Sequence, residues 1–197
     1  MTFDPQPVTL TGRHVRLEPL SEEHYEGLIA VAVGRRIFAY FPIQIETPAE
    51  IRAYLDYCRS QMASGQSVTF TTVDLATGRP VGGTSFLAID HAHRKLEIGG
   101  TWLAPDWQRT PANTEAKLLQ LTHAFEDLSA VRVEFKTDSL NEKSRNALTR
   151  IGAVEEGTMR NHIIVQPSGR HRHSVYFSVI ASEWPAVKVR LRAMLAR

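Results

Sequence analysis

One short segment carries the residue types best suited to bind an anion. Thr110 fits the N-cap of a helix and Pro111 its first position, where proline loses no hydrogen bond. The N–H groups of Ala112 and Asn113 would then be free at the positive end of the helix dipole, and Arg109 adds a full charge beside them. The alternative is a well-capped helix without a ligand, which this segment alone favours.

A second segment of interest begins at Asn141. Asn141 fits a helix N-cap after a strand, and Ser144 lies three residues later, so both side chains share one face near the helix start. An amide and a hydroxyl would therefore face the same space. Capping alone is the simpler interpretation when Asn141 is taken in isolation.

Both segments must be positioned by flanking strands and helices, which the hydrophobic periodicity predicts. The predicted strands are 14–18, 67–74, 81–90, 95–103, 131–137, 154–165 and 174–180. The predicted helices are 21–34, 47–65, 111–128, 141–151 and 182–197. Gly99 and Gly100 interrupt a strand, which indicates a bulge or a close backbone approach. This order predicts a mixed sheet in one α/β domain over residues 1–197.

The composition excludes several classes of protein. A length of 197 residues fits one domain, and a formal net charge of +2 leaves no polybasic footprint for nucleic acid. A single cysteine, Cys58, rules out an internal disulfide and a CxxC motif, which favours a cytoplasmic setting. No apolar run is long enough to span a membrane, and the first residues do not resemble a secretory signal. Nucleotide-loop, zinc-protease and serine-hydrolase motifs are also absent from the sequence.

Four motifs in order together resemble the GNAT superfamily of acyl-CoA-dependent N-acetyltransferases, specifically its Rim-type (RimJ/RimL-like) branch, which acetylates ribosomal-protein N-termini. They are E-I-G-x-x-W-L-x-P at 97–105, a loop leading into Thr-Glu-Ala at 108–116, Asn-x-x-Ser with a later Gly-Ala at 141–153, and Arg-Asn-His with Val-Tyr-Phe-Ser-Val-Ile at 160–180. The resemblance implies a mostly antiparallel sheet of about seven strands, splayed at the middle, with helices on both faces.

The resemblance also implies acetyl-CoA as co-substrate. Its pantetheine arm would pair with the backbone of the strand at 95–103 like an added strand, where Gly99 and Gly100 suit a close approach. The pyrophosphate would lie on the helix start that follows. The residues implied in binding are Trp102, Leu103, Gln108, Arg109, Thr110, Ala112, Asn113, Thr114, Asn141 and Ser144.

The implied reaction is direct attack of a neutral amine on the thioester, without a covalent enzyme intermediate. By resemblance, Asn141 would bond the cofactor near the thioester and Ser144 would protonate the departing thiolate, since the tyrosine of many members aligns near Leu148. An N-terminal amine has a pKa of about 7.7–8.0, against about 10.4 for lysine, so it needs only modest help from a base. Glu97 is the best candidate for that base, and its alternative is an outward-facing strand carboxylate.

The anion-binding loop departs from the family pattern at two positions. Its two expected glycines are Pro111, which has no N–H, and Asn113, which has a side chain where close approach is expected. Two interpretations follow: binding survives through Arg109, Ala112 and Asn113, or the chain is an acyl-CoA-binding domain with weak or no catalysis.

The acceptor and the assembly are less constrained. A protein N-terminus is the favoured acceptor, and a small-molecule amine is the alternative. The terminal helix and the last strands could form a homodimer. His91 with His93, and His171 with His173, are spaced like metal ligands, but neither pair has a visible third ligand, so no metal is expected.

Overall fold

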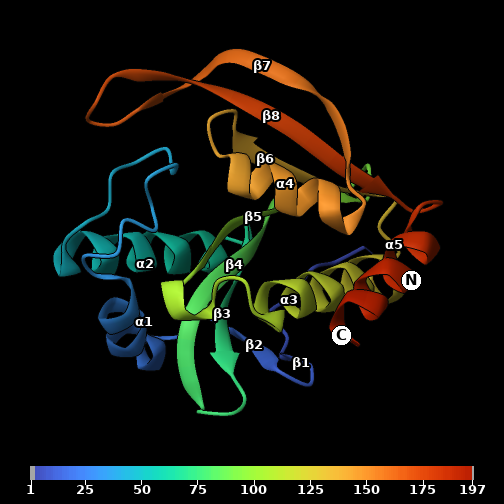
Figure 1. The fold of residues 1–197 in the computed structure, drawn as a ribbon, viewed down its shortest axis with the longest axis horizontal. Coiled ribbons are helices and arrows are strands. Elements are labelled where there is room, and N and C mark those ends of the chain that lie inside the picture. The colour runs from blue at the N-terminus through green and yellow to red at the C-terminus, as the bar shows by residue number, and fades with distance from the viewer. Residues whose placement is uncertain (1–2, 197) are drawn as a thin grey trace.

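The computed structural model describes residues 3–196, which form an eight-stranded sheet with helices on both faces (Figure 1). The strands follow the order β1-β2-β3-β4-β5-β6-β8-β7, and every neighbouring pair is antiparallel except β5 with β6. Their bounds are β1 Leu10–Thr11, β2 Val15–Pro19, β3 Val68–Asp74, β4 Arg79–Asp90, β5 Lys95–Leu103, β6 Arg132–Asp138, β7 Val154–Val165 and β8 Arg170–Ile180. The strand beyond the expected seven is β1, because two residues are too few to produce a periodic pattern.

Within the described residues, five α-helices cover the sheet. They are α1 Tyr25–Ala32, α2 Pro48–Ala63, α3 Pro111–Thr122, α4 Glu142–Ile151 and α5 Trp184–Leu195. The α-helix expected over 111–128 ends at Thr122. The chain then continues as a π-helical turn over His123–Asp127, after which the Leu128 N–H donates to the His123 carbonyl. Hydrophobic spacing alone does not separate these two forms of helix, so the sequence predicted a single long one.

The central feature of the sheet is the short contact between β5 and β6. These parallel strands pair at only three positions. The pairs are Lys95 with Arg132, Leu96 with Val133 and Glu97 with Glu134. Beyond Glu97 the described part of β5 pairs with β4 alone, so the sheet opens on its other side. Gly100 has a φ of 58°, a left-handed conformation that glycine adopts without strain. The splayed sheet that the resemblance implied is therefore confirmed.

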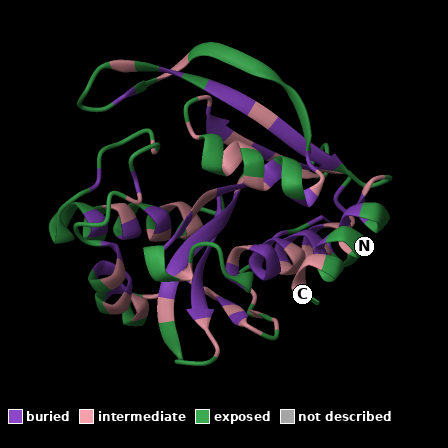
Figure 2. Cartoon of the chain, in the orientation of Figure 1, coloured by how far each residue is buried: buried purple, intermediate pink, exposed green. Residues whose placement is uncertain are grey.

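Two hydrophobic cores lie on opposite faces of this sheet (Figure 2). The larger core packs α3, α4 and α5 against one face, and it includes Leu96 and Ile98 of β5. The smaller core packs α1 and α2 against the other face and includes Trp102. Because side chains alternate along a strand, β5 contributes to both cores.

Glu115 joins the beginning of β2 to helix α3. Its buried carboxylate accepts the backbone N–H groups of Arg13 at 2.8 Å, His14 at 2.6 Å and Val15 at 2.7 Å. A Cβ atom at Gly12 would lie 2.4 Å from the carboxylate carbon, so only glycine leaves room for this contact. Helix α3 is thereby fixed to an early strand.

A second polar cluster lies in the larger core, between α3 and strands β4 and β5. The Lys117 ammonium donates to Thr101 Oγ1 at 2.9 Å, to Thr84 Oγ1 at 3.2 Å and to Gln120 Oε1 at 3.2 Å. These three partners are neutral, and burial lowers the pKa of Lys117 to about 7. The cluster holds β5 immediately after Gly100.

We expect Glu115→Ala to lower the free energy of unfolding by about 3 kcal/mol, because it leaves three backbone N–H groups without their acceptor. Urea denaturation monitored by circular dichroism measures this loss. Glu23→Ala, at an exposed glutamate, serves as the control and should change stability by less than about 0.5 kcal/mol. Equal effects of the two substitutions would contradict the role of Glu115.

The lowered pKa of Lys117 predicts that the stability of the folded protein depends on pH. The pKa of Lys117 is about 7 in the folded protein against an ordinary 10.5, so the unfolded chain binds the proton more tightly. The folded state therefore loses stability as the pH falls from about 10.5 toward 7. Relative to Lys117→Met, wild-type unfolding free energy should rise between pH 7 and pH 9 in urea denaturation. A difference between the two proteins that does not vary with pH would refute this.

Candidate active site

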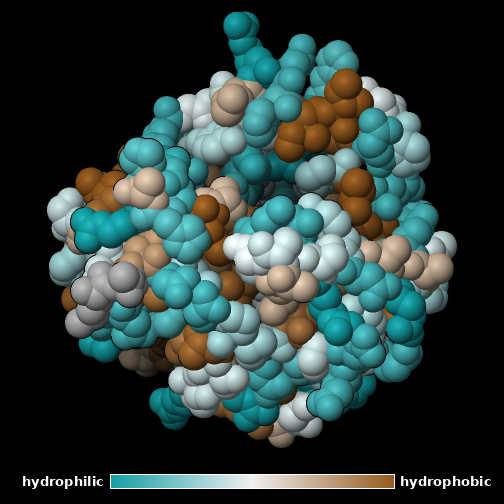
Figure 3. Space-filling model, turned by 180° about the vertical axis from the view of Figure 1, so that it is seen from behind, coloured by the Kyte–Doolittle hydropathy of each residue, from teal (hydrophilic) through white to brown (hydrophobic). Residues whose placement is uncertain are grey.

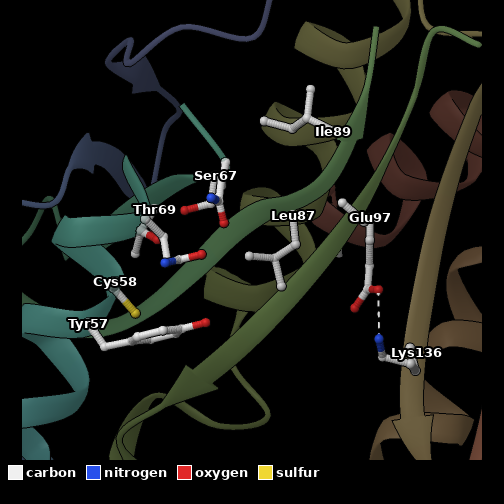
Figure 4. Close-up of a pocket in the computed structure, with 11 residues that line it drawn as sticks. Tyr57, Cys58, Ser67, Thr69, Leu87, Ile89, Glu97 and Lys136 are labelled. Atoms are coloured by element: carbon white, nitrogen blue, oxygen red, sulfur yellow. Dashed lines mark ion pairs between the residues drawn. The ribbon is translucent and has the colours of Figure 1, made fainter. Parts of the chain in front are cut away.

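A cavity of about 510 Å³ lies between the end of α2 and the sheet, on the face opposite α3 (Figure 4). Its walls combine hydroxyl, thiol and aliphatic groups with one ion pair. The labelled residues in Figure 4 are Tyr57, Cys58, Ser67, Thr69, Leu87, Ile89, Glu97 and Lys136. The ion pair lies where β5 and β6 begin to separate, so the cavity adjoins the opening in the sheet.

Glu97 is the last residue of β5 that pairs with β6, and its carboxylate points into this cavity. Its Oε2 lies 3.1 Å from Nζ of Lys136, and only 7% of the Glu97 side chain is exposed. A Cβ atom at Gly99 would lie 2.6 Å from Glu97 Oε1, so glycine at that position leaves room for the carboxylate. The interpretation of Glu97 as an outward-facing strand carboxylate is therefore wrong.

The start of α3 is capped as the sequence predicted. The Thr110 hydroxyl accepts the Ala112 N–H at 3.3 Å and donates to the Trp107 carbonyl at 2.7 Å. The expectation that the Ala112 N–H is free is therefore wrong, because the cap engages it. With Pro111 lacking an N–H altogether, the helix start offers fewer backbone donors than its position suggested.

The residues before the cap hold the loop in a defined shape. Gln108 donates from its side-chain amide to the Leu103 carbonyl at 3.0 Å, which ties the loop to the end of β5. Arg109 is exposed and has a φ of 65°, a left-handed conformation that is uncommon for a residue with a side chain. Its guanidinium is therefore accessible next to the start of α3.

The remaining residues predicted to bind the cofactor, on β5 and α3, differ in which of their atoms a ligand could contact. Trp102 is buried on the α1 and α2 side, where its ring lies 5.2 Å from that of Phe38, so only its backbone can face a cofactor. Leu103 is likewise a core side chain. Thr114 is buried and its hydroxyl lies 3.4 Å from the Arg150 guanidinium of α4, whereas Oδ1 of Asn113 is enclosed without a hydrogen-bond partner.

Asn141 caps α4, as the sequence predicted. Its Oδ1 accepts the N–H of Ser144 at 3.1 Å, which brings the two residues together at the helix start. Helix α4 follows β6, whereas α3 follows β5. The starts of the two helices therefore arise from the two strands that separate, and both helices lie on one face of the sheet (Figure 1).

The segment joining α1 to α2 contacts the tip of the β7–β8 hairpin (Figure 1), and no sequence pattern predicts this contact. The Gln44 N–H donates to the Gln166 carbonyl at 2.9 Å, and the Gln166 N–H donates to the Pro42 carbonyl at 3.0 Å. The buried Arg172 donates to the Tyr40 carbonyl at 3.2 Å. These segments have no hydrophobic periodicity that would predict the contact.

Within residues 3–196, no three His, Cys, Asp or Glu side chains converge as a metal site would require. The paired histidines have other contacts, since His93 lies against Asp90 and His173 accepts the N–H of Asn161.

None of the described helices is both long and apolar enough to cross a membrane. The rear face of the molecule carries interspersed hydrophilic and hydrophobic residues (Figure 3).

Comparison with known proteins identifies the class that this fold and site define. The acetyltransferase (GNAT) domain family matches residues 14–154. The chain therefore belongs to the GNAT acetyltransferase family, and the resemblance drawn from the four motifs is confirmed.

Individual relatives agree with this class. The chain is 37% identical over 114 residues to YdaF of Bacillus subtilis (strain 168), a candidate ribosomal N-acetyltransferase, and the match covers 58% of this chain and 61% of YdaF. A GCN5-related N-acetyltransferase from Brucella melitensis is 34% identical, with a TM-score of 0.88 over 98% of this chain and 88% of that one. RimJ of Mycobacterium smegmatis, solved with CoA-disulfide, has a TM-score of 0.82 at 21% identity over 95% of each chain, which shows a common fold.

We predict that the positive charge of Arg109 strengthens the binding of an anionic cofactor at this loop. Arg109→Gly keeps the left-handed backbone conformation without strain and removes the charge, so we expect acetyl-CoA to bind about tenfold more weakly. Isothermal titration calorimetry measures the change in Kd. Arg79→Ala, at an exposed arginine of the β3–β4 hairpin, should leave the Kd unaltered. An unchanged Kd for Arg109→Gly would show that Arg109 does not face the cofactor.

Proposed function

We propose that this protein transfers the acetyl group of acetyl-CoA to the N-terminal amine of a protein. The observation that carries the proposal is the opening between β5 and β6 beyond Glu97, with the starts of α3 and α4 beside it. In a GNAT family member, this opening leaves strand backbone free to pair with an extended ligand. Acetyl-CoA supplies the activated acetyl group, as a thioester, to an amine that enters from the Glu97 side.

The residues around the opening fit the cofactor. The backbone of β5 from Ile98 to Leu103 would hold the pantetheine arm, and Arg109 with the backbone of Asn113 would hold the pyrophosphate. RimJ of Mycobacterium smegmatis, which has the same fold, is named in complex with CoA-disulfide, and this supports a cofactor of the CoA type.

The cavity beside Glu97 suits a neutral amine. The Lys136 ammonium lies 3.1 Å from Glu97 and raises the electrostatic cost of bringing in a second cation. An N-terminal amine, with its ordinary pKa of about 7.7–8.0, loses its proton more easily than a lysine side chain. Glu97 would hold the amine and help to draw off its proton, and Ser144 would protonate the thiolate that leaves.

The name of the YdaF relative supports a ribosomal-protein type of acceptor, and a small-molecule amine is the alternative acceptor. The protein would work in the cytoplasm, where its buried Cys58 stays reduced. The terminal helix and the last strands are the surfaces that we propose for a homodimer.

A second candidate function is acyl-CoA binding with weak or no catalysis. The observation that favours it is the loss of two backbone donors at the start of α3, since Pro111 has no N–H and the Ala112 N–H bonds Thr110. Fewer donors weaken the binding of a pyrophosphate.

Two measurements separate these functions. Calorimetric titration of acetyl-CoA tests binding, and the absence of binding at millimolar cofactor would overturn the enzyme proposal. A thiol-release assay then compares peptides with a free N-terminus, the same peptides with a blocked N-terminus and an internal lysine, and small amines. Release that depends only on the free N-terminus supports the proposal, whereas release with small amines alone favours the alternative acceptor.

Asn141→Asp separates capping from catalysis, because aspartate caps a helix as well as asparagine but has no amide donor. We expect the midpoint of thermal unfolding to stay the same and the acetyl-transfer rate to fall about tenfold. Asn146→Asp makes the same change at an exposed position of α4 and should retain full activity. If Asn141→Asp transfers acetyl groups at the wild-type rate, then Asn141 serves only as a helix cap.

Ser144→Ala tests the proposed proton donor. We expect kcat to fall about a hundredfold with little change in the Kd of acetyl-CoA, because the hydroxyl acts on the leaving thiolate. Steady-state kinetics with calorimetry measure the two effects. A rate within twofold of wild type would remove Ser144 from the mechanism.

A further inference from the structure

A bulge in β7 directs one histidine toward the sheet face that carries Glu97. The register of β7 against β8 shifts between Met159 and Ile163. Within the bulge Asn161 has a φ of 50°, and its N–H donates to Nδ1 of His173 at 2.9 Å. A bulge re-aims the side chain next to it, which here is His162.

His162 extends a row of polar side chains that crosses four strands. Its ring packs edge-on against Tyr176 of β8, with the ring centres 5.8 Å apart. The Tyr176 ring lies 5.8 Å from Nζ of Lys136 on β6, which in turn lies 3.1 Å from Oε2 of Glu97 on β5. His162 therefore stands on the same sheet face as the acceptor cavity, beyond the Lys136 side chain.

The imidazole of His162 packs against Tyr176, but no hydrogen bond among the described residues holds its Nδ1 atom. Its Nδ1 is enclosed without a hydrogen-bond partner. Burial lowers the pKa of His162, and the charges of Lys136 and Arg172 lower it further, while Glu97 acts in the opposite direction. These effects favour the neutral imidazole, which is the form that can accept a proton.

Glu97 is poorly suited to keep the proton of the amine. Its carboxylate is bound to the Lys136 ammonium, and protonating it would leave that ammonium beside a neutral group. A neutral imidazole in the same row gains a proton without breaking an ion pair. Glu97 can therefore hold the amine and begin to draw off its proton, but it is poorly suited to keep that proton.

We propose that His162 is a catalytic residue that takes the proton of the attacking amine at Nε2, directly or through one water, while Glu97 orients that amine. This rests on the proposed function. The amine nitrogen bonds to the acetyl carbon, the carbon–sulfur bond breaks with its electron pair on sulfur, and the amine proton passes to His162. Ser144 protonates the sulfur, and solvent restores both side chains.

The first test needs no cofactor. Proton NMR titration of the free protein follows the imidazole C–H signals of His162, which packs against Tyr176 and feels the charges of Lys136, Arg172 and Glu97. We expect its pKa to lie below the ordinary value of about 6.5 and to rise in Lys136→Met, which removes a nearby positive charge. A pKa at or above the ordinary value, or one that Lys136→Met does not change, would overturn the proposal.

The second test is kinetic. With saturating peptide acceptor, wild-type kcat should fall tenfold per pH unit below the pKa of His162, and His162→Gln should lose this acid limb with kcat about a hundredfold lower. The Kd of acetyl-CoA should stay the same in His162→Gln. His171→Gln makes the same substitution at an exposed position of the hairpin and should keep the wild-type profile.

The outcomes separate this inference from the proposed function. If His162→Gln keeps wild-type kcat and the acid limb while Glu97→Gln loses activity, Glu97 is the base and the assignment of His162 is wrong. If the wild type acetylates no amine, the proposed function fails, and with it the catalytic role of His162.

Discussion

The brief parallel contact between β5 and β6 is the constraint on which the site depends. A parallel neighbour requires a long crossover, so α3 must leave the end of β5 and return before β6 begins. Because the two strands pair through only three registers, the rest of β5 keeps one backbone edge free within the described chain. The helix starts and the free edge are thus consequences of one connection.

The same strand separates the two halves of the proposed reaction. Alternation along β5 sends Leu96 and Ile98 into the core under α3 and sends Glu97 into the cavity beside α2. A cofactor along the free edge and an amine in the cavity would therefore approach from different faces. The contact of Pro42 and Gln44 with the hairpin joins the segment between α1 and α2 to the end of β7, and its hydrogen bonds involve neither β5 nor α3.

Local signals could be predicted from the sequence, and contacts between distant segments could not. Thr110 and Asn141 were assigned as caps because a cap depends on a few adjacent residues. The orientation of Glu97 stayed open because it depends on Lys136, which belongs to another strand. The motif that contains His162 supported the family, but its role depends on a bulge and on Tyr176, which no local pattern reveals.

The Glu115 carboxylate has a consequence for following the ligand by experiment. It bonds the amides of Arg13, His14 and Val15 from a position on α3 close to the anion-binding loop. Whatever tightens or loosens the first turns of α3 will slow or speed hydrogen exchange at these amides. An early segment that lies outside the proposed binding residues would thus report whether the proposed cofactor site is occupied.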